Sequence, residues 1–169
     1  MAKTGALWVG VADLLRRPGS RREEHREVDL GELGVSGTTV PAGSIVELDL
    51  LLEALNEGIV AKGTVAAPWT SECRRCLKPI GGRLEAEVLE IFETEPVEGE
   101  TSKLDVDRID LEPLARETVL LELPQGPLCR EDCAGLCPEC GADRNEGDCG
   151  HGDEPVDDRW AALRDISFE

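Results

Sequence analysis

Seven cysteines dominate the chemistry that this chain could perform. Four of them form two pairs in which two residues separate the partners, Cys73 with Cys76 and Cys137 with Cys140. Two thiolates at this spacing can point at one metal ion, and Gly141 permits the tight turn that aims backbone amides at the sulfurs. The Cys137 pair is the most specific metal-binding signal in the chain.

Three further cysteines and one histidine complete a set of eight candidate zinc ligands. The set comprises Cys73, Cys76, Cys129, Cys133, Cys137, Cys140, Cys149 and His151. Because tetrahedral zinc takes four ligands, the set would fill two sites. The odd number of cysteines, together with the cytosolic location that we expect, argues against a disulfide framework.

Distance along the chain divides the ligands into two groups. Cys137, Cys140, Cys149 and His151 lie within fifteen residues of one another, so a local site of three thiolates and one imidazole closes easily. The remaining group, Cys73, Cys76, Cys129 and Cys133, would clamp two distant segments together, and closing such a long loop stabilises more than closing a short one. An equally weighted alternative is a single site drawn from the five C-terminal cysteines, with two free thiols upstream.

The expected role of the metal is structural. A site closed by thiolates has no open position for a substrate, whereas a catalytic zinc keeps one. The competing interpretation is redox chemistry at Cys73 and Cys76, where Arg74 and Arg75 would lower the thiol pKa values. The alternative to a ligand role for His151 is that it is an ordinary histidine in an exposed loop. The chain has no hydrolase serine elbow, phosphate-binding glycine loop or dinucleotide fingerprint, so we expect no enzyme.

The elements that carry the first cysteine pair are predicted to be strands. Apolar and acidic residues alternate with period two from Ile45 to Ala54, which indicates a half-buried strand. Residues 56–58 supply turn chemistry, and residues 59–67 form a second extended run with a bulge predicted at Gly63. A third alternating run from residue 84 to about 92 completes an antiparallel meander.

The predicted fold class is α+β. It consists of an antiparallel β-rich domain, whose sheet either stays open or closes like a barrel, one main helix at about 111–122, and a zinc-stapled C-terminal segment. Asp110 is expected to cap the helix, Pro124 to end it, and residues 157–163 to form a short closing helix. We divide the chain into a basic N-terminal arm (1–26), the β-rich domain (27–124) and the cysteine-rich segment with the closing helix (125–169).

The net charge of −18 excludes general capture of nucleic acid by the whole surface. Almost all of the acidity lies in residues 84–158, and two basic islands remain as candidate RNA or partner contacts. They comprise Arg16, Arg17, Arg21 and Arg22 in the arm, and Arg74, Arg75 and Lys78 beside the first cysteine pair. The alternative interpretation is that these basic residues lie in ordinary solvated loops and contact no partner. The chain shows no membrane-spanning run and no signal peptide, so we expect a cytoplasmic protein.

The order of these features resembles the YceD family, the large ribosomal RNA subunit accumulation proteins, in its cysteine-rich bacterial form. The motifs that carry the resemblance are SECRRCLKP (71–79), LARETVLLELP (114–124), LCREDCAGLCPECG (128–141) and DRWAAL (158–163). After Gly150 this chain has His151 where a cysteine is expected.

The resemblance implies a non-enzymatic factor needed for accumulation of 23S ribosomal RNA during large-subunit assembly. Its implied partners are the large-subunit precursor, the 23S rRNA itself, or a ribosomal protein or assembly factor. Two other functions stay open: a redox-responsive protein that uses the Cys73 pair, and an acidic module that holds a basic ribosomal protein.

Overall fold

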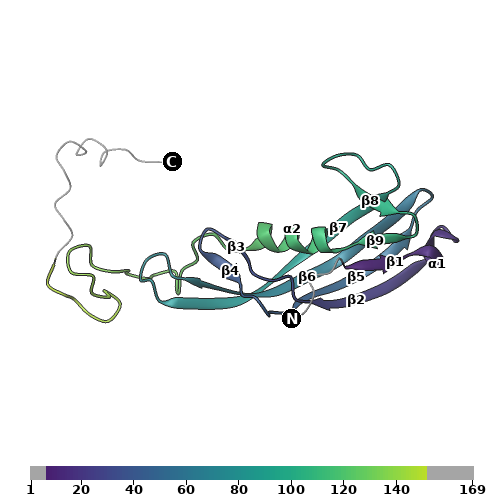
Figure 1. Ribbon diagram of the computed structural model, residues 1–169. Coiled ribbons are helices and arrows are strands. Elements are labelled where there is room, and N and C mark those ends of the chain that lie inside the picture. The colour runs from purple at the N-terminus through teal and green to yellow at the C-terminus, as the bar shows by residue number, and fades with distance from the viewer. Residues whose placement is uncertain (1–6, 152–169) are drawn as a thin grey trace.

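The computed structural model describes residues 7–151, in which one curled nine-stranded sheet and two helices form an α+β fold (Figure 1). The strands are β1 (Trp8–Gly10), β2 (Arg21–Val28), β3 (Leu33–Val35), β4 (Thr38–Val40), β5 (Val46–Ala54), β6 (Gly58–Glu72), β7 (Pro79–Glu93), β8 (Ser102–Asp105) and β9 (Arg108–Asp110). The helices are α1 (Ala12–Leu15) and α2 (Glu112–Glu122). The closing helix predicted at 157–163 lies outside the described residues. Neither helix of residues 7–151 is long and apolar enough to cross a membrane.

The hairpin of β6 and β7 is the centre of the sheet. On one side β5 pairs with β6 and β2 pairs with β5, all antiparallel. On the other side β8 pairs with β7 in parallel, followed by β9 and β1. The β3–β4 hairpin joins the distal end of β6, where Thr39 lies opposite Thr70.

The three predicted strands of the meander are confirmed as β5, β6 and β7, but β6 and β7 are each 15 residues long. The bulge predicted at Gly63 is wrong, because Gly63 pairs with Leu50 and Val88 in an unbroken register. Glycine is required there for another reason. Its φ is +154°, and a Cβ atom would lie only 2.0 Å from the backbone oxygen of Asp49.

The N-terminal region differs from the predicted basic arm, because Arg21–Val28 is the edge strand β2, paired along its whole length with β5. Its charged side chains point to both faces, so it lacks the apolar alternation that marks a strand. Inward charge on an edge strand also discourages pairing with other chains. The described residues show no pairing between β1 and β2, so the sheet stays open. The Arg22 guanidinium of β2 nevertheless reaches across this gap. It donates to the Gly10 carbonyl of β1 (2.7 Å) and to the Asp13 carboxylate of α1 (2.8 Å).

The core lies between the sheet and α2, which packs against β3, β6 and β7 (Figure 1). It is aliphatic apart from Phe92, and Ala115 and Val119 are the helix residues that are fully buried in it. The predicted helix is confirmed, and the Glu112 backbone N–H donates to the Asp110 carboxylate (3.0 Å) at its start.

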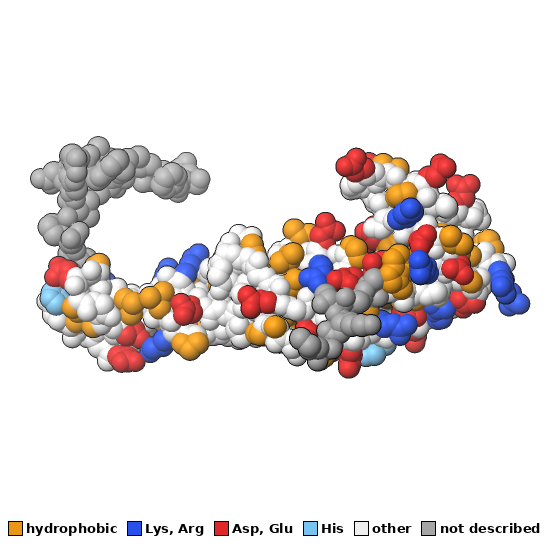
Figure 2. Space-filling model, in the orientation of Figure 1, with side chains coloured by type: hydrophobic (Ala, Val, Ile, Leu, Met, Phe, Trp, Pro, Cys, Tyr) orange, Lys and Arg blue, Asp and Glu red, His pale blue; other side chains and the backbone are white. Residues whose placement is uncertain are grey.

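The cysteine-rich segment lies at the far tip of the β6–β7 hairpin, well beyond the helix (Figure 1), and forms the left end of the described part of the molecule in Figure 2. From 127 to 151 the chain contains no helix or named strand, only one isolated bridge between Leu136 and Asp143. The buried Thr38 hydroxyl holds the start of this segment beside β6, because it donates to the Pro124 carbonyl (2.7 Å) and lies 3.0 Å from the Ser71 hydroxyl.

Candidate metal centres

Four thiols from two distant segments meet at the tip of the β6–β7 hairpin, and we call them the first cluster. Cys73 and Cys76 come from the turn between the strands, and Cys129 and Cys133 come from the segment that follows α2. All four Sγ atoms lie within 4.8 Å of one another, with 3.8 Å between Cys73 and Cys133 and 3.7 Å between Cys76 and Cys129. Four sulfurs at 2.3 Å from a tetrahedral zinc lie about 3.8 Å apart, so the cluster fits this ion.

The second cluster is local, and it unites Cys137, Cys140, Cys149 and His151, whose ligand atoms also lie within 4.8 Å of one another. Cys137 is buried, whereas Cys140 and His151 are exposed. The His151 Nε2 atom is 3.5 Å from the Glu139 carboxylate, which can orient the ring. The grouping predicted from chain distance is therefore the grouping in which the structure places these side chains.

The two cysteine pairs have the same backbone conformation. In each, the residue after the second cysteine donates its N–H to the carbonyl of the first, over 2.9 Å from Leu77 to Cys73 and over 2.9 Å from Gly141 to Cys137. The N–H of the first cysteine in turn donates to the carbonyl five residues later, at 2.9 Å and 2.8 Å. Gly141 and Leu77 both adopt a left-handed conformation, with φ of +72° and +58°. The upstream pair thus repeats the turn of the downstream pair, with leucine in the place of glycine.

Backbone hydrogen bonds favour the thiolate form of one cysteine in each cluster. Burial opposes ionisation of Cys73, but three backbone N–H donors, two of them in its own turn, lower its pKa to about 6. Backbone N–H donors of its loop also lower the pKa of Cys137, to about 7. Burial and the neighbouring thiols raise the pKa of Cys129 to about 12. A soft divalent cation would relieve the crowding of thiolates, so the donor set favours a metal such as zinc.

A side chain that no sequence motif marked supports the first cluster. The Asn145 Nδ2 atom lies 3.5 Å from the Cys133 sulfur and donates to it. Its Oδ1 atom accepts from the Ala134 backbone N–H (2.8 Å) and from Arg130 (2.7 Å). Asn145 belongs to the loop between Cys140 and Cys149, so residues near the second cluster position a ligand of the first.

Two basic residues that were candidate RNA contacts join the hairpin tip to the cysteine-rich segment. Arg75 Nη1 donates to the Cys133 carbonyl (2.9 Å). Lys78 Nζ lies 2.7 Å from the Asp143 carboxylate and 2.9 Å from that of Glu146. Lys78 and the hydrogen bonds from Asn145 lower the pKa of Asp143 to about 2. Arg75 and Lys78 therefore hold the cysteine-rich segment against the hairpin tip.

The remaining candidate contacts fall into two groups. Arg21 is ion-paired with Glu53 (3.0 Å) and Arg22 with Asp13, so both guanidinium groups have partners within the fold. Arg16, Arg17 and Arg74 are exposed, and within residues 7–151 their side chains form no ion pair.

The chain is similar to one protein family and to several mycobacterial proteins. The family model described as "Large ribosomal RNA subunit accumulation protein YceD" matches residues 61–167, which include all eight candidate ligands. Uncharacterized proteins of Mycobacterium tuberculosis and Mycobacterium bovis are each 39% identical over 165 residues, covering 93% of this chain and 79% of theirs. An uncharacterized protein of Mycobacterium leprae is 33% identical over 164 residues, covering 92% and 75%. No solved structure matches this chain.

Proposed function

We propose that this chain, which belongs to the YceD family of large ribosomal RNA subunit accumulation proteins, is a non-enzymatic, zinc-binding factor that supports accumulation of 23S rRNA during large-subunit assembly. The observation that carries the zinc part of the proposal is the convergence of seven thiols and one imidazole into two groups of four. As such a factor the protein acts in the cytoplasm, on large-subunit precursors.

The role proposed for zinc is to fold the cysteine-rich segment. Each cluster supplies all four ligands that tetrahedral zinc needs, which leaves no position for a substrate. Residues 127–151 have little apolar core of their own, so metal binding would supply the free energy that orders them. The first cluster would then clamp this segment to the tip of the β6–β7 hairpin.

We also propose that direct contact with 23S rRNA, where it occurs, is local and involves Arg74. The net charge of −18 repels phosphate at long range. Arg74 is exposed at the hairpin tip, without an ion-pair partner among residues 7–151, whereas Arg75 and Lys78 are engaged within the fold. Arg16 and Arg17 lie in a different region, beside α1, and are the second candidate contact.

One observation favours a second candidate function, reversible oxidation of Cys73 and Cys76. The lowered pKa of Cys73 is typical of a reactive thiol. The solvent-exposed fraction of Cys73 is 0%, however, so an oxidant reaches it only when the clamp opens. Slow reaction of the zinc-loaded protein with a thiol reagent, and fast reaction after chelation, would favour the structural role over the redox role.

The test of the proposed function is the ratio of 23S to 16S rRNA in a strain that lacks the gene. Wild-type protein should restore a lowered ratio, and so should Lys103→Glu, which reverses an exposed cation on β8 remote from the hairpin tip. Cys137→Ser,Cys140→Ser should fail to restore it, and Arg74→Glu should reduce sedimentation of the protein with large-subunit precursors. A normal ratio in the deletion strain, or full rescue by the cysteine variant, would refute the proposal.

A further inference from the structure

We propose that the outer face of β2, β5, β6 and β7 is a docking surface for a cationic protein segment that carries apolar side chains. This face is the side of the sheet opposite to α2, and it lies on the body of the sheet, away from the cysteines at the hairpin tip. The inference goes beyond the proposed function, because it requires neither metal binding nor contact with RNA.

The strand register brings four apolar side chains together on this face. Leu51, Lys62 and Leu89 lie side by side across β5, β6 and β7, and Val60 and Ile91 lie in the neighbouring row. Leu89 is 68% exposed, and the other three apolar side chains are half-buried.

This patch is unusual because the same strands already carry the core on their other face. Leu48, Leu50 and Leu52 of β5 point to the core side and are at most 3% exposed. An antiparallel sheet with one buried face normally has polar residues on the other. A scattered exposed leucine needs no explanation, but contiguous apolar side chains on the solvent side indicate a contact with another molecule.

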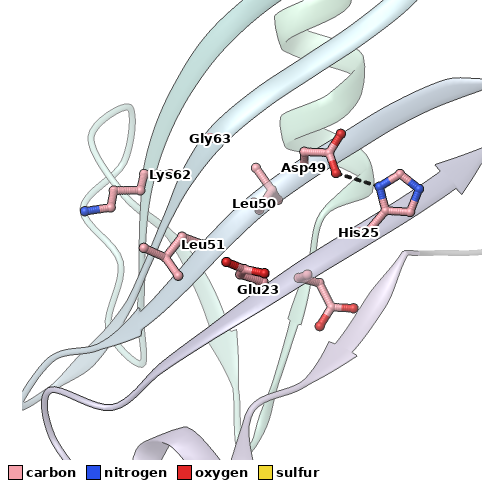
Figure 3. Close-up of a pocket in the computed structure, with 8 residues that line it drawn as sticks. Glu23, His25, Asp49, Leu50, Leu51, Lys62 and Gly63 are labelled. Atoms are coloured by element: carbon pink, nitrogen blue, oxygen red, sulfur yellow. Dashed lines mark hydrogen bonds and ion pairs between the residues drawn. The ribbon is translucent and has the colours of Figure 1, made fainter.

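Two hollows border the patch and meet at Gly63. The first has a volume of about 350 Å³, and Figure 3 shows Glu23, Leu51 and Lys62 around it, with His25 hydrogen-bonded to Asp49 at its far side. The second, of about 560 Å³, lies over β6 and β7 and includes Leu89 in its lining. The face is therefore recessed on both sides of the Lys62 stem, which gives room for the side chains of a partner.

Charge defines the chemistry of the partner. By register, nine carboxylates occupy outward positions on these four strands, against three permanent cations. The carboxylates are Glu23, Glu27, Glu47, Asp49, Glu53, Glu72, Glu85, Glu87 and Glu93, and the cations are Arg21, Lys62 and Arg83. Arg83 is held by Glu47 (2.7 Å) and Arg21 by Glu53 (3.0 Å). Acidic side chains thus surround an apolar centre, an arrangement complementary to lysine or arginine around apolar residues.

The same charge disfavours the other occupants of this face. Residues 152–169 carry six acidic and two basic side chains, so the C-terminal part of the chain would be repelled. A second copy would present the same acidic rim, and RNA would present phosphates. A basic segment of a protein, such as the lysine-rich extension of a ribosomal protein, is the occupant that this surface fits.

The probe that tests the proposal is a short synthetic peptide of alternating lysine and leucine, with its Kd for the full-length, zinc-loaded protein measured by fluorescence anisotropy. We expect binding that weakens as salt concentration rises. A lysine–serine peptide and a glutamate–leucine peptide should each bind at least about tenfold more weakly. Equal affinity for either comparison peptide would overturn the proposal, since binding would then not need both charge and apolar contact.

Matched variants locate the binding. Leu89→Ser and Glu87→Lys should each weaken peptide binding about tenfold. Leu121→Ser and Glu117→Lys, which change an exposed leucine and an exposed glutamate on α2, should leave it unchanged. Circular dichroism confirms that each variant is folded. Equal losses in both sets, or none in the first, would overturn the assignment to this face.

Two further results would show that something other than a cationic segment occupies this face, and either would overturn the proposal. One is self-association of the protein that Leu89→Ser abolishes in sedimentation equilibrium. The other is tighter peptide binding after Trp160→Ser, which would mean that the C-terminal residues compete for the face. Peptide binding should persist in Cys137→Ser,Cys140→Ser, so failure of the metal proposal and failure of the docking proposal are distinguishable.

Discussion

Asn145→Ala should weaken zinc binding at the first cluster, although Asn145 is not a ligand. The substitution removes the Nδ2 donor that lies 3.5 Å from the Cys133 sulfur. It also removes the Oδ1 acceptor that holds the Ala134 backbone N–H (2.8 Å) and Arg130 (2.7 Å), and with them the loop that carries Cys133. Losing such a contact to a metal ligand typically costs about 10- to 100-fold in affinity, or about 1.4–2.7 kcal/mol of binding free energy.

Two comparison variants sharpen this experiment. Asn145→Asp keeps an acceptor for Ala134 but places an anionic oxygen beside the Cys133 thiolate, so it should lose more affinity than the alanine variant. Asn56→Ala, in the exposed turn between β5 and β6, should lose none. Site affinities are measured by competition with a chromophoric chelator. Cobalt spectra distinguish the four-sulfur site from the site with one histidine. An unchanged affinity of the four-sulfur site in Asn145→Ala would refute the reasoning.

Other substitutions test the fold around the sites. Gly63→Ala should lower the free energy of unfolding by roughly 3 kcal/mol or more, because its Cβ would collide with the Asp49 backbone oxygen; Gly10→Ala, which meets nothing within 4 Å, is the control in denaturant titrations. Leu77→Gly should stabilise the protein by about 1 kcal/mol, because it relieves a left-handed leucine that is 56% exposed, and a lower Tm would contradict this. The hydrogen bond and charge of Asp49 raise the pKa of His25, so NMR titration should place it above 6.5 and Asp49→Asn should lower it. The stabilisation from this pair is present below pH 6.5 and is lost as pH rises through the raised pKa, and an unshifted titration would argue against the pair.

The grouping of the candidate ligands is one of the two arrangements that the sequence left open, and it depends on loop closure. The loop between Cys140 and Cys149 is short and contains glycines, so local closure leaves Cys73, Cys76 and two downstream cysteines as the complementary set. The structure brings together those same four thiols. The central strands were also predictable, since β5 alternates apolar and acidic residues except at Leu51.

The elements that were missed lack a local signal. β2 reads Arg-Arg-Glu-Glu-His-Arg-Glu-Val, and its strand conformation depends on pairing with β5 and not on apolar alternation. β1, β8 and β9 have only 3, 4 and 3 residues, which is too short for a periodicity to show.

Long-range side-chain contacts were equally hidden from sequence reasoning. Lys78 and Asp143 are far apart in the sequence, and only the fold shows that this lysine is engaged and not free for RNA. The same holds for Asn145, which no ligand motif includes. The outer-face patch has no local sequence signal, because Leu51 and Leu89 come from different strands and are brought to the two sides of Lys62 only through the register with β6.

The most direct test of two zinc-binding clusters is the metal content of the purified protein, measured by elemental mass spectrometry and repeated on Cys73→Ser,Cys76→Ser. We predict two zinc ions per chain in the wild type and one in the variant, because the variant loses two ligands of the first cluster and none of the second. The same zinc content in both proteins, or no bound metal in either, would contradict the two-site arrangement and leave Cys73 and Cys76 available for redox chemistry.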